Sequence, residues 1–456
     1  MTYADRARLA ALWEDELRLF RERHPRSGEL WQRAREHLPG GVPMLWMAKW
    51  PGDWPVYVED AAGAHFRCAD GIDHVDLCLG DTGAMVGHAP AASVAAISER
   101  LARGSTFMLP TADAGVAAGL LAERFGLPEW QFTLSATDAN RHVLRYARQA
   151  TGRRKVLVID YCYHGTVDEA YATLDDDRNV VSRRRNIGPP VPLDETTVVV
   201  AFDDIAGLEA ALDTGEVAAV LIEPAMTNIG IVLPADGWHD AVRAACDRTG
   251  TVLVIDETHT LCAGPGGMTA RDGLRPDVVV VGKTIGGGIP AAAWGMTREL
   301  ADRVRDSLEW AGEGREDLDV GGVGGTLAGN AVSMAGIRAT LSEVLTADVY
   351  PGMIDRATEW TAGVQAAIDE FGAPWQVTQL GCRAEYSFRA TAPSNGREAA
   401  DADDFELQQY LHLHALNRGI LITPFHNMAL MCPATTSEDV ERHTVAFREA
   451  VASLYA

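Results

Sequence analysis

Short apolar runs alternate with longer segments of helical periodicity between about residue 80 and residue 300 of this 456-residue chain. Valine, isoleucine, leucine and alanine dominate the runs, and hydrophobic and polar positions do not alternate within most of them. This pattern is typical of strands covered on both faces, as in a mostly parallel sheet flanked by helices. It predicts seven strands, at residues 131–135, 155–160, 196–202, 217–224, 251–257, 277–283 and 291–297.

The two ends of the chain have different patterns. Within the first 38 residues, Leu9, Leu17 and Phe20 recur at helical spacing, which predicts amphipathic helices. A hairpin turned at Ala62-Gly63 follows. A glycine-rich stretch, residues 312–330, is predicted as a mobile loop, and the remainder reads as helices with a few strands, such as 384–390 and 419–425.

These patterns predict an α/β protein of two domains. Residues 79–330 form the large domain, which contains the seven-stranded sheet. The smaller α/β domain combines an N-terminal segment, residues 1–78, with the C-terminal residues 331–456. We expect the loop at residues 40–55 to lie at the entrance of the active site. A chain of 456 residues exceeds one ordinary hydrophobic core, which agrees with this division.

The charge balance excludes several classes of partner. Sixty-four acidic residues against 40 basic ones give a net charge of −24, so nucleic acid and anionic membranes would be repelled. No apolar run approaches the roughly 20 residues that span a bilayer. The first residues lack the apolar core of a signal peptide, so we expect a cytoplasmic protein.

The cysteines argue against two kinds of structural site. There are seven, an odd number, and none forms a C-x-x-C pair. A disulfide framework or a zinc site is therefore not expected, and no metal is predicted.

The stretch DVVVVGKTIGGGIP, residues 277–290, contains one lysine between a valine run and three glycines. Gly282-Lys283-Thr284 could end a phosphate-binding P-loop, but that motif needs glycine where this chain has Asp277. The four valines between favour an extended strand, and a carboxylate would repel phosphate. The alternative is a lysine held at the end of a buried strand for covalent chemistry.

A lysine that bonds covalently to pyridoxal phosphate needs a carboxylate beside the pyridine nitrogen, to keep that nitrogen protonated. Asp256 ends the preceding predicted strand, so both side chains should lie at the same edge of the sheet. The alternative for Asp256 alone is an acid that caps the following helix.

Two further strand ends carry candidate residues. Ser135, Ala136 and Thr137 open a predicted helix whose free N–H groups could bind a phosphate, although an ordinary Ser/Thr cap gives the same letters. Tyr163 could stack on a cofactor ring, with Gly165 allowing close approach of the backbone. A buried structural tyrosine is an equally good interpretation.

Several motifs together resemble one family. They are DETHT at 256–260, GKTIGGGIP at 282–290, Tyr-His-Gly at 163–165, Glu-Pro at 223–224 and GTLAGN at 325–330. The combination is similar to the class III aminotransferases, pyridoxal-phosphate enzymes of fold type I. The branch it resembles contains glutamate-1-semialdehyde aminomutase and the β-amino-acid and amine aminotransferases.

The resemblance implies a role for each matching position. Lys283 would carry the cofactor, Asp256 would pair with the ring nitrogen and Tyr163 would stack on the ring. Thr326 would reach the phosphate from the neighbouring subunit of an obligate homodimer. The remaining positions implied to bind the cofactor are Ser135, Ala136, Thr137, His164, Gly165 and Glu223.

The chain departs from the family pattern where relatives acting on amino acids place an arginine. DETHTLCAGPGG has none, the loop at 40–55 has only Lys49, and the C-terminal stretch offers His426. Trp46, Trp50 and Trp54 suggest an aromatic entrance for a bulky apolar substrate, amine-like or β-amino-acid-like. A hydrophobic cluster tying the N-terminal segment to the core is the alternative for the tryptophans.

The expected activity is a ping-pong transfer of an amino group between an amine or amino acid donor and a carbonyl acceptor. A 1,2-aminomutase, a racemase or a decarboxylase would use the same cofactor residues. A catalytically silent protein of this fold is a remote third interpretation, because both Lys283 and Asp256 are retained.

Overall fold

The computed structural model describes residues 5–183, 186–188, 191–310 and 321–455. The chain divides into two compact units. We call Met1–Pro90, Asp348–Ala392 and Asp401–Ala456 the terminal unit, and Ala91–Ala347 with Pro393–Ala400 the central unit. The boundaries at residues 78 and 330 stay predictions of the sequence.

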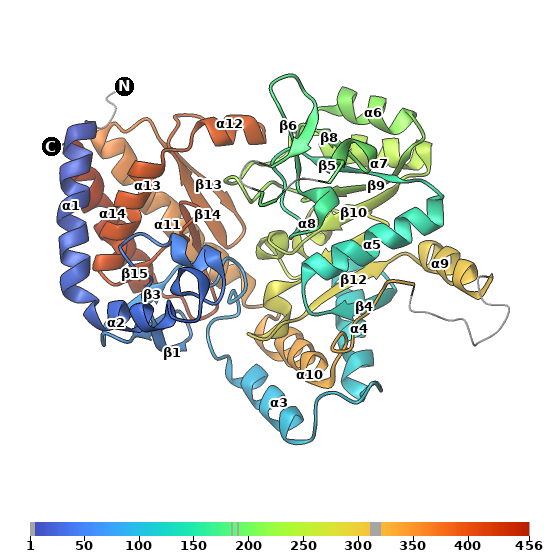
Figure 1. Cartoon of the computed structure of the whole chain (residues 1–456), viewed down its shortest axis with the longest axis horizontal. Helices are drawn as coiled ribbons and strands as arrows, with labels where there is room; N and C mark the ends of the chain where they lie inside the picture. Colours follow the sequence, from blue (N-terminus) through green and yellow to red (C-terminus); the bar gives the residue numbers. More distant parts are fainter. Residues whose placement is uncertain (1–4, 184–185, 189–190, 311–320, 456) are drawn as a thin grey trace. The chain divides into compact units, whose positions relative to one another are not determined.

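A seven-stranded sheet forms the core of the central unit, in the order β4-β12-β11-β10-β9-β5-β8 (Figure 1). β12 is antiparallel to both its neighbours, and the other pairs are parallel. The mostly parallel sheet is therefore confirmed, and each predicted strand is present. The strands are β4 (Glu129–Thr133), β5 (Lys155–Ile159), β8 (Thr197–Val200), β9 (Val217–Ile222), β10 (Val252–Asp256), β11 (Val278–Val281) and β12 (Ala292–Met296).

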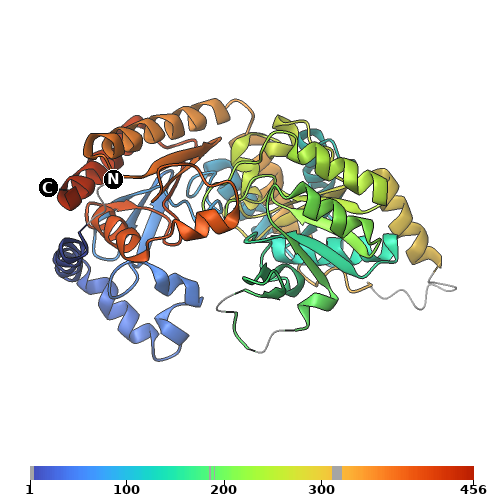
Figure 2. The same cartoon turned by 90° about the horizontal axis from the view of Figure 1, so that it is seen from above.

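Helices cover this sheet on both sides, as Figures 1 and 2 show. Every residue of β9, β10 and β11 is buried, which explains their continuous apolar sequences. α5 (Ala136–Thr151) packs across β9, β11 and β12, and α7 (Trp238–Thr249) packs on β10 and α6 (Ile205–Asp213). The other helices are α3 (Ala91–Ala102), α4 (Ala112–Phe125), α8 (Gly267–Arg271), α9 (Arg298–Trp310), α10 (Ala331–Ala339) and α12 (Gly396–Asp401).

Short elements complete the central unit. β6 (Ala172–Leu174) and β7 (Val180–Ser182) form a separate two-stranded sheet. The 3₁₀ turns are η3 (Asp168–Ala170), η4 (Leu193–Glu195), η5 (Thr260–Ala263) and η6 (Lys283–Gly286), and η8 (Thr340–Val344) is π-helical. Of the loop predicted at 312–330, residues 312–320 lie outside the described residues, and 321–330 form turns that lead into α10.

The terminal unit contains two small sheets and five long helices. The sheets are β1-β2-β3-β15, made of Val58–Ala62, His65–Cys68, Asp73–Asp76 and Ile420–Leu421, and β13-β14-β16, made of Gln376–Leu380, Arg383–Ser387 and Met428–Leu430. The helices are α1 (Arg6–Arg23), α2 (Pro25–Ala34), α11 (Tyr350–Phe371), α13 (Phe405–Asn417) and α14 (Ser437–Tyr455), with 3₁₀ turns η1 (Pro39–Gly41) and η2 (Leu45–Lys49).

The hairpin predicted at Ala62-Gly63 is present, with Ala62 opposite His65. The strand predicted at 419–425 is much shorter, because only Ile420 and Leu421 pair with β3. Pro424 cannot donate to a ladder and disfavours regular pairing around it, which limits this strand.

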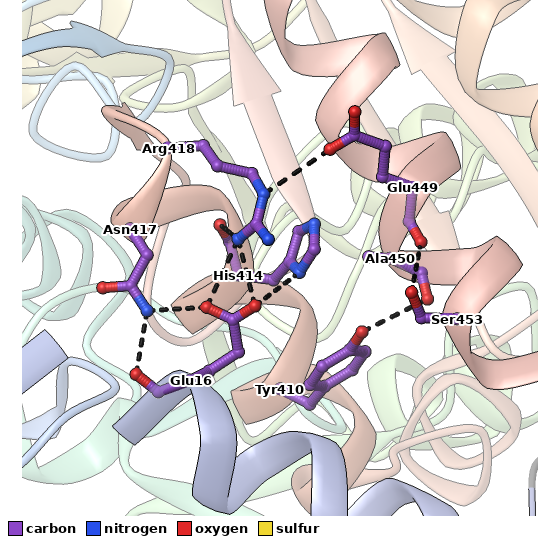
Figure 3. A network of polar contacts seen from close by, with 8 residues as sticks. All are labelled: Glu16, Tyr410, His414, Asn417, Arg418, Glu449, Ala450 and Ser453. Atoms are coloured by element: carbon purple, nitrogen blue, oxygen red, sulfur yellow. Dashed lines mark hydrogen bonds and ion pairs between the residues drawn. The ribbon is translucent and has the colours of Figure 1, made fainter. Parts of the chain in front are cut away.

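A buried carboxylate anchors α1 to α13 (Figure 3). Glu16 Oε1 contacts His414 Nδ1 at 2.9 Å, and Glu16 Oε2 accepts from Asn417 Nδ2 at 2.7 Å. Arg418 adds an ion pair at 3.0 Å. Burial raises the pKa of Glu16, but the hydrogen bonds from His414 and Asn417 and the charges of His414 and Arg418 outweigh it, and the pKa is lowered. Glu16 is therefore ionised, and it holds the N-terminal helix by charge-assisted bonds.

Among the described residues, no helix is long and apolar enough to cross a bilayer.

Candidate functional site

The candidate site lies in the central unit, at the carboxyl edge of the parallel strands. Asp256 is the last residue of β10 and pairs in register with Val280 of β11, which is followed by Lys283. The loop after β5 carries Tyr163 and His164, and Glu223 follows β9. Parallel neighbours deliver their carboxyl ends to one edge, which is where ligands bind in such sheets.

Asp256 is a buried acid, and three groups hold its carboxylate. Oδ2 contacts His164 Nδ1 at 3.0 Å and accepts from Asn140 Nδ2 at 2.9 Å, and Oδ1 accepts from the Thr258 N–H at 3.1 Å. Burial raises the pKa of Asp256, but the hydrogen bond and the charge of His164 outweigh it, with help from Thr258 and Asn140, and the net pKa is lowered. The site therefore keeps a negative charge in a place that excludes water.

His164 is 1% exposed, and its contact with the Asp256 carboxylate stabilises the negative charge of that carboxylate. Burial by itself lowers the pKa of His164, but the Cys162 sulfur and the Asp256 carboxylate outweigh burial, and the pKa is raised. Asn140 also donates to the His164 carbonyl at 3.2 Å, so one amide orients both partners. His164 thus contacts Asp256, and the Tyr-His-Gly stretch includes a residue that positions the carboxylate.

Lys283 directly follows β11 and begins the 3₁₀ turn η6. Its φ of +52° lies in the left-handed region, which costs a non-glycine residue about 1 to 3 kcal/mol and is concentrated at functional sites. Lys283 Nζ lies 2.7 Å from His259 Nε2. Because an ammonium group only donates, a protonated Lys283 uses His259 Nε2 as its acceptor.

Asp277, where a P-loop needs glycine, instead pairs with Arg243 at 3.0 Å.

The N-terminus of α5 lies next to this lysine. Ser135 caps the helix and accepts from the Asp138 N–H at 3.2 Å. The N–H groups of Ala136 and Thr137 have no acceptor within the described ranges. A Cβ added at Gly282 would lie 3.1 Å from Ala136 Cβ, so only a small residue fits between strand and helix. The turn therefore presents two free donors beside the strand that carries Lys283.

The loop after β5 approaches the same helix end. Gly165 has a φ of +76°, and a Cβ there would lie 2.0 Å from Thr137 Oγ1, so the close approach requires glycine. The Tyr163 N–H donates to Glu223 Oε1 at 3.1 Å, and Thr227 donates to the other oxygen. Burial raises the pKa of Glu223, which the charge of His164 only partly offsets. Glu223 thus fixes the backbone of the loop that bears Tyr163.

Three residues of this site escaped the sequence analysis. Asn140 lies near the start of a predicted helix, and Glu257 and His259 lie in the DETHT motif, where neither was given a role of its own. Glu257 is fully buried and accepts from Thr260 Oγ1 at 2.5 Å and from the Met268 N–H at 3.1 Å, which holds the loop that replaces the relatives' sequence. The available signal was spacing, because Asn140 follows Thr137, and His259 follows Asp256, each by three residues.

The four residues predicted for the substrate all lie in the terminal unit. Trp46 is 47% exposed and meets the Phe425 ring edge-on at 6.3 Å, and Trp50 is half-buried. Trp54 packs in a cluster with Leu17 and Phe20 and donates to the His24 carbonyl at 2.9 Å. His426 is buried, with Nδ1 3.4 Å from Glu385 Oε1. Trp54 therefore belongs to a hydrophobic cluster of the N-terminal segment, which is the alternative interpretation of the tryptophans.

Thr326 is exposed. It lines a hollow of about 540 Å³ in the central unit, formed by residues 105–110, 325, 326 and 328–331. None of the residues around Asp256 and Lys283 lines this hollow.

Comparison with known proteins assigns the class that this fold and site define. The model of the family "Aminotransferase class-III" matches residues 46–451, so the chain belongs to the class III aminotransferase family. The glutamate-1-semialdehyde 2,1-aminomutase of Sorangium cellulosum is 31% identical over 440 residues, which cover 95% of this chain and 97% of that protein.

Two solved structures show how far the similarity extends. A glutamate-1-semialdehyde-aminomutase from Pseudomonas aeruginosa PAO1 is 47% identical, with a TM-score of 0.97 and 99% of each chain covered. A lysine-to-alanine form of it was solved in complex with PMP. An omega-transaminase from Sphaerobacter thermophilus is 28% identical, with a TM-score of 0.86, and the match covers 96% of this chain and all of that one. The fold is that of the fold type I enzymes, and the cofactor is pyridoxal 5'-phosphate.

The residues of the central unit fit this cofactor. Asp256 offers an ionised carboxylate for a ring nitrogen, and the free N–H groups of Ala136 and Thr137 suit a phosphate. Lys283 supplies a primary amine for the aldehyde, and the Thr258 hydroxyl is buried with no hydrogen-bond partner within the described residues. The site therefore offers a partner for the ring nitrogen, the phosphate and the aldehyde of the cofactor.

Proposed function

We propose that the protein transfers an amino group between an amine-bearing carbon and a carbonyl carbon, as an aminotransferase with a bulky apolar substrate. The observation that carries the proposal is the pairing of Lys283 with His259 at the same sheet edge as the ionised Asp256. A base that removes a proton from carbon and a carboxylate that stabilises the charge left behind are the two requirements of this chemistry.

The bound cofactor supplies an electron sink, which takes up the electron pair left when a C–H bond of the substrate breaks. Asp256 keeps a proton on the ring nitrogen, and His164 and Asn140 keep Asp256 ionised and oriented. Lys283 Nζ takes the proton from the carbon that bears the amino group. His259 Nε2 accepts from the lysine and directs it.

Support for the substrate class comes from the residues that replace the expected arginine. The loop after Asp256 is held by Glu257, and it contributes His259 and Thr260 in place of a guanidinium. Without a fork of N–H donors, a substrate carboxylate loses its strongest partner. Trp46 presents an exposed ring in the terminal unit, which suits an apolar group.

A 1,2-aminomutase is the second candidate, favoured by the names of the Sorangium and Pseudomonas relatives. An aminomutase and a transaminase need the same Lys283 and Asp256. The mutase returns the amino group to another carbon of the same substrate, whereas the transaminase passes it to a second substrate. A racemase would share the first proton transfer only.

A substrate panel separates these activities. We expect an arylalkylamine to bleach the visible band of the cofactor-loaded enzyme and to turn over only with a carbonyl acceptor such as pyruvate or 2-oxoglutarate. Amines carrying an α- or β-carboxylate should show no higher kcat/KM, because no arginine pairs with them. Glutamate 1-semialdehyde supplied alone is the control, and its steady conversion without an acceptor would establish the mutase instead. A strong preference for either acid would contradict the substrate class.

We further propose that the enzyme is a homodimer in which Thr326 binds the phosphate of the neighbouring subunit's cofactor. Thr326 lines a hollow beside Phe107, Met108 and Leu109, which are 44%, 85% and 74% exposed. Leu327 is 49% exposed next to them. So many exposed apolar side chains around one hollow are typical of a protein interface.

Substitution in this face tests the dimer. Leu109→Asp is expected to shift the protein from dimer to monomer in light scattering and to weaken cofactor retention, because a carboxylate would be buried without a partner. Ile187→Asp is the matched control, since Ile187 is 91% exposed elsewhere in the central unit. Thr326→Ala should keep the dimer and still lose cofactor more readily. A monomeric wild-type protein would overturn this proposal without affecting the proposed reaction.

A further inference from the structure

A buried cluster of two histidines and one cysteine lies in the terminal unit, among segments that the proposed reaction does not use. His24 joins α1 to α2, Cys68 ends β2 and His74 lies in β3. All three are completely buried. His24 and His74 each offer a ring nitrogen and Cys68 its sulfur, and these three atoms lie within 4.8 Å of one another.

The backbone fixes which nitrogen of each ring carries the proton. His24 Nδ1 lies 3.2 Å from the Phe20 carbonyl and His74 Nδ1 lies 3.1 Å from the Ile72 carbonyl. A carbonyl oxygen only accepts, so both Nδ1 atoms donate and both Nε2 atoms keep a lone pair. A backbone carbonyl on the second nitrogen is also the arrangement that orients metal-binding histidines.

Both Nε2 atoms are left without a partner. Among the described residues, neither the Nε2 of His24 nor that of His74 makes a hydrogen bond, and both are fully buried. An unsatisfied buried polar atom costs about 1–3 kcal/mol, so the two unpartnered Nε2 atoms call for an occupant.

Aromatic packing holds the two rings in place. Phe20 stacks on His24 with ring centroids 4.6 Å apart, and Phe66 stacks on His74 at 4.6 Å with the planes only 3° apart. Stacking and the hydrogen bonds of the Nδ1 atoms therefore fix the orientation of both rings.

We propose that this cluster is a zinc site, in which His24 Nε2, His74 Nε2 and Cys68 Sγ bind one ion and a water molecule completes the tetrahedron. Two imidazoles and a thiolate are a ligand set that zinc prefers over magnesium or calcium. Zinc–nitrogen and zinc–sulfur bonds of about 2.0 and 2.3 Å place these ligand atoms about 3.3–3.5 Å apart. The three atoms, which lie within 4.8 Å of one another, would close toward these separations when the ion binds. The Zn–S bond replaces the S–H bond of Cys68, and the thiol proton leaves to solvent.

The ion would connect the two N-terminal helices to the β1-β2-β3-β15 sheet. The absence of C-x-x-C pairs predicted no metal, but this cluster has one cysteine, and its ligands lie 44 and 6 residues apart in the chain. A bound water that donates to both Nε2 atoms is the competing occupant, and it would satisfy the same lone pairs without a metal.

Metal analysis of the cofactor-loaded full chain, purified without a histidine tag, decides between the two. We expect about one zinc per chain in the wild type, and after chelation a restored content and a higher Tm on adding ZnCl₂. Cobalt in place of zinc should give the visible bands of a tetrahedral ion and a near-ultraviolet sulfur-to-metal band. Cys68→Ser should remove the sulfur band and weaken zinc binding by about 100-fold, whereas Cys246→Ser, another buried cysteine, should leave both unchanged.

His74→Gln provides a second test that does not depend on the cysteine variant. It should keep the sulfur-to-cobalt band but lower metal affinity, because one nitrogen ligand is lost. A wild type that takes up no zinc or cobalt under these conditions, and whose Tm does not respond to ZnCl₂, would overturn the proposal in favour of the water. The wild-type cobalt spectrum alone decides the matter if both variants fail to fold.

Discussion

Lys283→Ala is expected to lower kcat by about 10⁴-fold or more, while the chain stays folded and still binds the cofactor. In the proposed function the amine is both the covalent attachment point and the base at the substrate carbon, and the loss of either role alone would be severe. The left-handed backbone at residue 283 favours neither lysine nor alanine, so the substitution adds little new strain. The measurements are single-turnover kinetics and the visible absorbance of the loaded variant, which should shift because no covalent bond to residue 283 forms.

The lysine content of the chain makes a direct chemical test possible. Only three lysines occur in the sequence, Lys49, Lys155 and Lys283. Borohydride reduction followed by peptide mapping should place the cofactor on Lys283 and on neither of the others. Lys155→Ala is the matched control, because Lys155 is a partly exposed lysine of the same unit that pairs with Glu216. A reduced adduct on Lys49 or Lys155, or a Lys283→Ala variant of normal kcat, would contradict the assignment.

The fold was predictable because its strands are unusual in composition. β9 and β11 are buried along their whole length, so their sequences are continuous runs of apolar residues that no surface element would carry. Asp256 and Lys283 stand out for the same reason, since each is the first charged residue after such a run. Their roles as cofactor residues stay predictions that the experiments above address.

The partners of these residues could not be predicted, because they come from distant segments. Asn140 reaches Asp256 across 116 positions, and a single amide inside a helix carries no pattern that marks it as functional. His24, between α1 and α2, likewise meets Cys68 and His74 of the sheet only in the folded terminal unit. Sequence periodicity identifies elements, whereas the contacts between them depend on packing that no local pattern encodes.

Asp256→Asn is expected to lower kcat by about 10²- to 10³-fold with a smaller effect on KM. An amide has nearly the shape of the carboxylate, but it cannot hold a proton on the ring nitrogen by charge. His164 should respond as well, because its raised pKa depends partly on the Asp256 carboxylate, and without that charge its pKa should fall.

A pH titration of the visible band distinguishes this electrostatic role from a structural one. In the wild type the ring nitrogen should stay protonated at neutral pH, because the lowered pKa of Asp256 keeps the carboxylate charged down to acid pH. In Asp256→Asn the band should titrate at a lower pH than in the wild type, since protonated nitrogen loses its counter-charge. Glu257→Gln is the matched control, because Glu257 is the adjacent buried acid but binds Thr260, Met268 and Thr269. It should lower stability without moving the titration. An Asp256→Asn variant whose titration and kcat equal those of the wild type would show that the carboxylate serves the fold alone.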